Sequence, residues 1–470
     1  MKTGRVLLAA LATVAVAAPA MALNVEWHGD LNNRFSYSTQ ADLSKRVVND
    51  THNYLSVGGF SNYSGILTST TRPVDTKKNR KDSDFFGEIK YRMNLDVSDD
   101  DKKVKGVVGF EFGSAKFGNA DMPFGGDQNN FELMWAYTDI QLPFDQASRF
   151  IVGLQPVGYN YTLWTDNAPG VKWVRKDGNW GYSLGWFRND WGGANKNDAG
   201  GDKKSEYDDA FVGDMTYTFN NGNSLNAFVI FMDQGREAKT FANGGFVDGG
   251  LAGRITDARD SQIWLGLSGK GKWNNFSGLF TGIYLTGEVK TKGTIEDNFD
   301  REAYLFHGQL DYKMDKTTFT LGGLYTSGDK NPNDGKLKNF DVIDATTGFI
   351  GSVVIFDNLA DDNSFTQAPY LFDKGYALLY AGARHELTKK AWVSARYLWH
   401  NTAEDLVTAQ GSGDEVGHEF VLGAGYQIMK GLTAEIAAGY LIAGDAWDAL
   451  SSTGKADDVF RTDANIRFRF

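Results

Sequence analysis

The sequence predicts an all-β fold, a transmembrane antiparallel β-barrel of about 18 strands, or of 16 at the next lower even count. Apolar and polar residues alternate with a period of two in segment after segment of the chain. Short and long connections also alternate between these segments, which is typical of short periplasmic turns and long extracellular loops. The composition, with 55 glycines, 8 prolines and 14% aromatic residues, suits long strands, tight turns and interfacial aromatic belts.

Residues 1–22 have the pattern of a secretory signal peptide. Lys2 and Arg5 precede an apolar run that starts at Val6, and Ala20-Met21-Ala22 fits a cleavage site. The apolar run is too short to span a bilayer as a helix. We therefore expect a signal peptide, 1–22, followed by a single barrel domain, 23–470, in the outer membrane of a Gram-negative bacterium.

Each predicted strand is a segment with one apolar and one polar face. In the last segment, Phe460, Thr462, Ala464, Ile466, Phe468 and Phe470 alternate with Arg461, Asp463, Asn465, Arg467 and Arg469. In a barrel the apolar set faces lipid and the polar set faces a watery lumen. In chain order the predicted strands are 23–38, 84–97, 104–112, 130–142, 148–157, 169–176, 179–189, 207–219, 223–233, 260–272, 274–289, 301–314, 316–327, 374–387, 389–401, 415–428, 431–443 and 456–470.

The connections give the direction of the strands. Turns rich in Gly, Asn, Asp and Lys, such as 177–179 and 220–223, close one end of the predicted hairpins. Longer segments, among them 39–83, 158–168, 328–373 and 402–414, close the other end. Nine hairpins leave both chain ends at the periplasmic side, as export through an N-terminal signal requires.

Two stretches resemble known families. The alternation of Ile466, Phe468 and Phe470 at the chain end resembles the assembly signal of bacterial outer-membrane proteins. The stretch Tyr325-Thr326-Ser327-Gly328-Asp329, with Asp334-Gly335-Lys336 and Phe340, resembles a motif in porins of the alginate-export type. That resemblance implies an 18-stranded barrel and a monomer, whereas other porins of similar architecture commonly form homotrimers.

The polar faces of the strands supply the candidate site, a charged lumen wall that replaces water around ions and orients small polar solutes. Arginine and lysine outnumber acids on the wall near the seam, which favours anions, although the net charge of −11 opposes this preference. Cross-strand pairing is the alternative role, with Arg467 facing Glu26, or Arg461 facing Asp30 or Asp463. The residues predicted to line the pore are Arg34, Glu88, Lys90, Arg92, Arg384, Arg396, Glu419, Glu435, Arg461 and Arg467.

Other chemistry has little support in the sequence. The chain has no cysteine, which excludes thiolate metal sites and covalently attached c-type haem. The histidines have no metal-site spacing, and no Ser-His-carboxylate set or nucleotide-binding motif is present. We therefore expect no enzyme activity, no cofactor, no metal and no nucleic-acid partner. The basic run 77–81 could contact lipopolysaccharide or be a solvated loop.

The apolar stretch 348–356 lies in the longest predicted loop after strand 316–327 and is costly to expose. It would be covered inside the lumen, over the mouth of the barrel or against a neighbouring subunit.

The functional hypothesis is an outer-membrane porin for passive diffusion of ions or small polar solutes, with membrane lipid and lipopolysaccharide as surroundings. The alternative is the barrel scaffold of a porin–cytochrome electron conduit, in which a partner would bring the haem.

Overall fold

A computed structural model describes the strands and part of the loops. It covers residues 23–39, 83–117, 131–189, 208–234, 258–291, 298–331, 334–343, 345, 348–356, 374–408, 411–450 and 455–470. The predicted signal peptide and the basic run 77–81 lie outside these residues. Among the residues covered, no helix has the length and apolar character needed to cross a bilayer.

The described residues form 19 strands, and each predicted strand corresponds to one of them. The strands are β1 (Asn24–Thr39), β2 (Ser83–Ser98), β3 (Val104–Lys116), β4 (Phe131–Leu142), β5 (Asp145–Asn160), β6 (Trp164–Asp177), β7 (Trp180–Asn189), β8 (Asp208–Thr218), β9 (Ser224–Gln234), β10 (Ala258–Trp273), β11 (Phe276–Thr291), β12 (Asn298–Met314), β13 (Thr317–Thr326), β14 (Lys336–Leu337), β15 (Tyr376–Glu386), β16 (Ala391–Thr408), β17 (Gly411–Met429), β18 (Leu432–Ala443) and β19 (Val459–Arg469).

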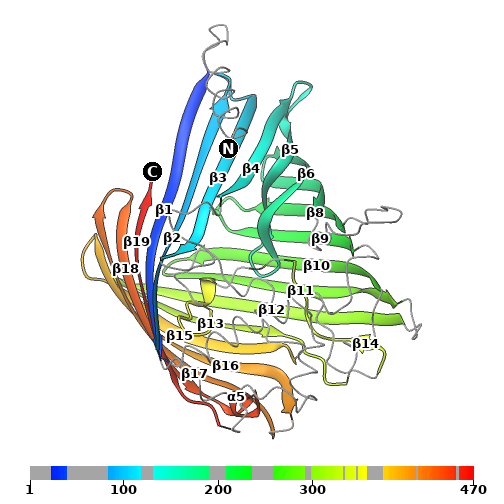
Figure 1. The fold of residues 1–470 in the computed structure, drawn as a ribbon. Coiled ribbons are helices and arrows are strands. Elements are labelled where there is room, and N and C mark those ends of the chain that lie inside the picture. Colours follow the sequence, from blue (N-terminus) through cyan, green and yellow to red (C-terminus); the bar gives the residue numbers. More distant parts are fainter. Residues whose placement is uncertain are drawn as a thin grey trace, which may run out of the picture.

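Eighteen of these strands form a closed antiparallel ring in chain order. Each strand pairs with the next, β13 pairs with β15, and β1 pairs with β19. The short β14 stands outside the ring count because it only adds in parallel to the end of β12. Figure 1 shows the blue β1 beside the red β19 at the seam. The predicted transmembrane β-barrel of 18 strands is thus confirmed.

Burial along the strands is inverted relative to a soluble protein. On β1, Arg34 is buried at 6% exposure, whereas Phe35 beside it is 39% exposed. On β2, Glu88 and Lys90 are buried, whereas Phe85 is exposed. Closure of the sheet satisfies the backbone hydrogen bonds of every strand, so the apolar outer face can contact lipid without unpaired polar groups.

The seam is staggered. The backbone N–H of Gly29 donates to the Phe470 carbonyl at 3.0 Å, and the N–H of Phe470 donates to the Gly29 carbonyl at 3.1 Å. The five residues of β1 before Gly29 therefore extend beyond β19 and pair with β2 alone. Ile466, Phe468 and Phe470 are exposed on the outer face next to this edge. Their role as an assembly signal stays a prediction.

Two predicted loops are wrong in length. The β5–β6 connection is 161–163, not 158–168, and the β16–β17 connection is 409–410, not 402–414. In both hairpins the ladder continues past a register irregularity, between Gly158 and Asn160 in one and around Asn401 in the other. A bulge breaks the alternation in sequence without ending the strand. The sequence also did not predict β14, the 3-10 turn η3 (Gly348–Ile350) or the helix α5 (Asp445–Leu450).

Candidate functional site

The inner face near the seam is charged, and its charges are paired. The Arg34 Nε–H donates to Glu88 Oε1 at 2.7 Å on the neighbouring strand. Glu111 of β3 accepts from Arg92 at 2.6 Å and lies 2.9 Å from the Lys90 ammonium. The like-charged neighbours Lys90 and Arg92 on β2 therefore share one acid of β3, and the three cations of this wall are all paired.

The arginines of β19 are also paired. Arg467 forms a two-pronged contact with Asp30 at 2.6 and 2.5 Å, and Arg469 donates to the same carboxylate at 3.1 Å. Arg461 donates to Asp463, two residues along its own strand, at 3.1 Å. Of the pairings predicted from sequence, Arg461 with Asp463 is confirmed and Arg467 with Glu26 is wrong. The register places Asp30 opposite Arg469, diagonal to Arg467.

The other predicted pore-lining residues have different surroundings. Glu419 is fully buried beneath the loop between β13 and β15, and Arg396 is half-buried beside the same loop. Glu435 is half-buried, on the side of β18 that also carries the buried Ala437. Arg384 lies over the Trp392 ring at 4.0 Å near the periplasmic turn. A role for these ten residues in lining a conducting path stays a prediction.

The loop between β13 and β15 folds into the lumen. Its apolar side chains are almost completely buried, and Figure 1 shows the yellow η3 turn within the ring of strands. Burying one such side chain contributes about 1.5–3 kcal/mol. Of the three placements that would cover the stretch 348–356, the lumen is thus the one adopted. The buried apolar members of the loop are Leu337, Phe340, Val342, Ile343, Ala345, Ile350, Val353, Val354, Ile355 and Phe356.

The stretch 325–340, which resembles a motif of alginate-export-type porins, bends the chain inward at the start of this loop. A Cβ at Gly328 would lie 2.1 Å from the Lys374 carbonyl, so only glycine permits this close approach. The Asp329 carboxylate accepts from the backbone N–H of Asn331 and of Lys338 at 3.0 and 3.2 Å. The Phe340 N–H donates to the Ser327 carbonyl at 3.1 Å, which turns the chain back toward the barrel wall.

Glu419 anchors the tip of the loop. Its Oε1 accepts from the backbone N–H groups of Val353 and Val354 at 2.7 and 2.8 Å, and its Oε2 accepts from Ser352 Oγ at 2.6 Å. His400 Nε2 lies 3.2 Å from the same carboxylate. One wall residue thereby satisfies three donors of the loop, as a buried carboxylate requires.

A second anchor joins the loop to β10 and β12. The Arg301 guanidinium donates to both oxygens of Asp260, at 2.9 and 2.6 Å, and lies 3.8 Å from Asp341 of the loop. Gln262 donates to both carboxylates at 2.9 Å. Burial raises the pKa of the Asp341 carboxyl above its usual range, although Arg301 opposes this shift. This cluster is buried and positions the loop.

An aromatic cluster surrounds the η3 turn. His307 hydrogen-bonds Tyr161 at 2.5 Å through one ring nitrogen and Tyr380 at 2.9 Å through the other. The Phe349 ring lies 4.8 Å from that of Tyr161. Burial raises the pKa of Tyr161 to about 12, so its hydroxyl stays protonated at neutral pH. The Arg396 guanidinium lies 5.2 Å from the Tyr380 ring and donates to the Phe349 carbonyl at 3.3 Å.

Several residues of this site were missed at the sequence level, chiefly Glu111, Asp260, Arg301 and Lys172. The Lys172 ammonium lies over the Tyr159 ring at 5.7 Å on the inner side of β6. The sequence did contain a signal that Arg301 is covered, because Arg301 shares the inner face of β12 with the apolar residues Ala303 and Leu305. An apolar inner face indicates that something other than water covers the wall there.

Comparisons with known proteins support the fold. No protein-family model matches the chain, and no curated protein matches it. Among solved structures, a BenF-like porin from Pseudomonas fluorescens is similar with a TM-score of 0.53 and 11% identity, over 95% of this chain and 98% of that one. OpdQ of Pseudomonas aeruginosa gives 0.52 at 10% identity over the same shares.

The OpdK structure of Pseudomonas aeruginosa with vanillate is similar at a TM-score of 0.51 and 11% identity, over 95% of this chain and 98% of that one. Such likeness covers almost the whole length of both chains at low identity, so it shows the fold alone. None of these three is described as a porin of the alginate-export type. The chain therefore has the fold of bacterial outer-membrane porins.

Proposed function

We propose that this protein is an outer-membrane channel for the passive diffusion of ions or small polar solutes in a Gram-negative bacterium. The observation that carries the proposal is the inverted barrel, with charged side chains inside a closed ring and large apolar side chains outside. A loop folded into the lumen narrows the path and puts its backbone beside wall residues such as Arg396. This arrangement sorts solutes by size and charge.

The proposal includes the surroundings expected from the sequence. These are removal of residues 1–22, insertion among lipid and lipopolysaccharide, and assembly as a monomer or homotrimer. The resemblance of 325–340 to alginate-export-type porins remains a prediction, since its residues serve here to turn the loop inward. We also propose that the protein is not an enzyme, because the fold is that of channels.

The electron-conduit scaffold is the weaker alternative. It needs a lumen free to hold a haem protein, and the described part of the β13–β15 loop is packed inside the barrel. The two anchors at Glu419 and Arg301 hold it there.

The first prediction is channel activity itself. Purified protein reconstituted into a planar lipid bilayer should give stepwise conductance that persists at low voltage, because the inner wall is polar and wet. Heat-denatured protein, which has lost the barrel, serves as the control. Silence from protein whose gel mobility proves a folded barrel would remove the channel proposal.

We propose that charge selectivity depends on lumen cations that form no ion pair. Within the described residues, neither Arg396 nor Lys172 forms an ion pair; each instead lies against an aromatic ring. The seam-wall cations are instead paired with Asp30, Glu88, Glu111 and Asp463. We therefore propose a preference for anions set by Lys172 on β6 and Arg396 on β16, two strands on opposite sides of the ring.

The second prediction concerns Arg396. Arg396→Gln should reduce the ratio of anion to cation permeability by roughly twofold or more, because a local charge outweighs distant charges that salt screens within about 8–10 Å. The reversal potential in a salt gradient measures this ratio. Arg396→Lys should preserve it, and Lys389→Gln, at an exposed periplasmic turn, should leave it unchanged. An equal shift in both glutamine variants would show that net charge decides selectivity.

A further inference from the structure

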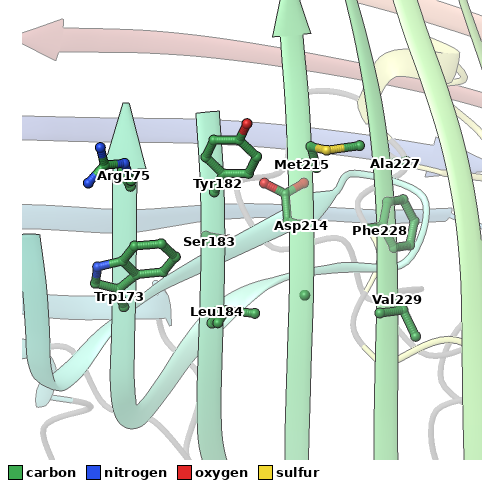
Figure 2. Close-up of a pocket in the computed structure, with 11 residues that line it drawn as sticks. Trp173, Arg175, Tyr182, Ser183, Leu184, Asp214, Met215, Ala227, Phe228 and Val229 are labelled. Carbon is green, nitrogen blue, oxygen red and sulfur yellow. The ribbon is translucent and has the colours of Figure 1, made fainter. Parts of the chain in front are cut away.

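The lipid-facing side of β6 to β9 carries a hollow of about 630 Å³. The strand register aligns its outward residues in two rows across four strands. Figure 2 shows Trp173, Leu184 and Val229 in one row. The other row contains Arg175, Tyr182 and Met215 and lies nearer to the turns that join β6 to β7 and β8 to β9. Gly213 belongs to the first row, between Leu184 and Val229.

The floor of the hollow exists because Gly213 has no side chain. Its neighbours project outward, with Leu184 59% exposed and Met215 and Val229 each 42% exposed. A Cβ at Gly213 would meet Val229 at 3.3 Å and Leu184 at 3.7 Å, and the backbone there is not left-handed. Glycine is therefore not required by chain geometry. An empty depression in hydrocarbon forfeits dispersion contacts, so a flexible apolar chain is the occupant that fits.

One end of the hollow is charged. Arg175 forms ion pairs with Asp145 and, at 3.5 Å, with Asp177 at the end of β6. The Asp177 side chain is 67% exposed and the Tyr182 ring stands in the row of Arg175. This end adjoins the short turn between β6 and β7, at the level of lipid headgroups in the periplasmic leaflet.

We propose that the hollow binds one phospholipid of the periplasmic leaflet with a primary ammonium headgroup, of the phosphatidylethanolamine class. One acyl chain lies across Gly213 between Leu184 and Val229, the phosphate faces Arg175, and the ammonium faces Asp177. The two carboxylates beside a single guanidinium leave this rim acidic, which favours an ammonium-bearing headgroup over one with net negative charge. The assignment rests on the proposed location in the outer membrane.

Native mass spectrometry of the folded barrel tests the site. The protein is exchanged into detergent with equal amounts of phosphatidylethanolamine and phosphatidylglycerol of the same acyl chains. Wild type should retain one phosphatidylethanolamine in preference to phosphatidylglycerol. Gly213→Leu fills the floor and should reduce this retention by roughly tenfold, since a displaced chain loses its apolar contacts. Asp177→Asn should keep a bound lipid and lose the headgroup preference.

Gly282→Leu is the matched control, because Gly282 is an outward glycine of β11 in a separate lipid-facing hollow. It should retain phosphatidylethanolamine like wild type, and the heat-dependent gel mobility of each variant confirms folding. Undiminished retention by folded Gly213→Leu would overturn the site. Equal retention of both lipids by wild type would overturn the headgroup assignment. If the wild type forms dimers or trimers and Gly213→Leu dissociates them, the hollow is a protein interface and not a lipid site.

Lipid retention and conductance are separate readouts. A barrel that retains phosphatidylethanolamine at this hollow and yet conducts nothing would refute the channel and leave the lipid site standing. A conducting barrel that retains no phospholipid would refute the lipid site and leave the channel standing.

Discussion

Glu419→Leu should release the inserted loop from the lumen and increase single-channel conductance, with frequent transitions between levels. The substitution removes the acceptor of Ser352, Val353 and Val354 and leaves those donors buried without a partner. Each buried unsatisfied donor costs about 1–3 kcal/mol. Because every 1.4 kcal/mol is about tenfold in an equilibrium, the displaced state should gain at least about a hundredfold in population.

Two measurements separate loop release from general damage. The chain has no cysteine, so Ala345→Cys, in a residue that is 1% exposed, reports loop position by its reactivity with a water-soluble thiol reagent. It should be unreactive alone and reactive with Glu419→Leu. Glu435→Leu removes a half-buried glutamate from the lumen side of the adjacent strand, β18, and should leave Ala345→Cys unreactive. Unchanged conductance and thiol reactivity in Glu419→Leu would show that apolar burial alone holds the loop.

Arg301→Met should destabilise the folded barrel by about 3–5 kcal/mol, the usual cost of removing one partner from a buried ion pair. The methionine leaves the carboxylates of Asp260 and Asp341 enclosed without the guanidinium between them. Urea unfolding in detergent, followed by the loss of heat-dependent gel mobility, measures the free energy of unfolding.

Arg188→Met is the matched control for burial. Arg188 also contacts its partner, Asp209, in a two-pronged arrangement at 2.8 and 2.9 Å, but both side chains are partly exposed. Exposed pairs contribute about 0–1 kcal/mol, so this variant should unfold near wild type. If Arg301→Met lowers the free energy of unfolding only slightly, and Arg301→Met/Asp260→Asn restores it, the guanidinium still acts as the counter-charge of Asp260. Equal losses at Arg301 and Arg188 would contradict the role of burial.

The strand arrangement follows from local patterns. A period of two and the turn residues between segments are short-range properties, so the number, order and facing of the strands are readable from the chain alone. The predicted strand ends are wrong where the hydrogen-bond ladder continues through a bulge, as near Asn401. The alternation there is interrupted in sequence while the hydrogen bonding between strands is not.

Pairing within the lumen depended on register. The sequence places Arg467 and Glu26 on inner faces of neighbouring strands, but a shift of a few residues decides which acid a given arginine meets. The observed register puts Asp30 within reach of both Arg467 and Arg469. That register is fixed by the whole closed ring, which no single strand specifies.

The sequence by itself determined that this chain is a barrel with an apolar outside, a polar inside and a long loop whose apolar tip, 348–356, had to be covered. Only the tertiary structure decided where that tip goes. Its anchor Glu419 lies more than sixty residues further along the chain, on β17. The physical reason is that hydrophobic burial is non-directional. The apolar residues of the tip determine that it must be buried. Which wall residue accepts its hydrogen bonds, here Glu419, depends on closure of the ring.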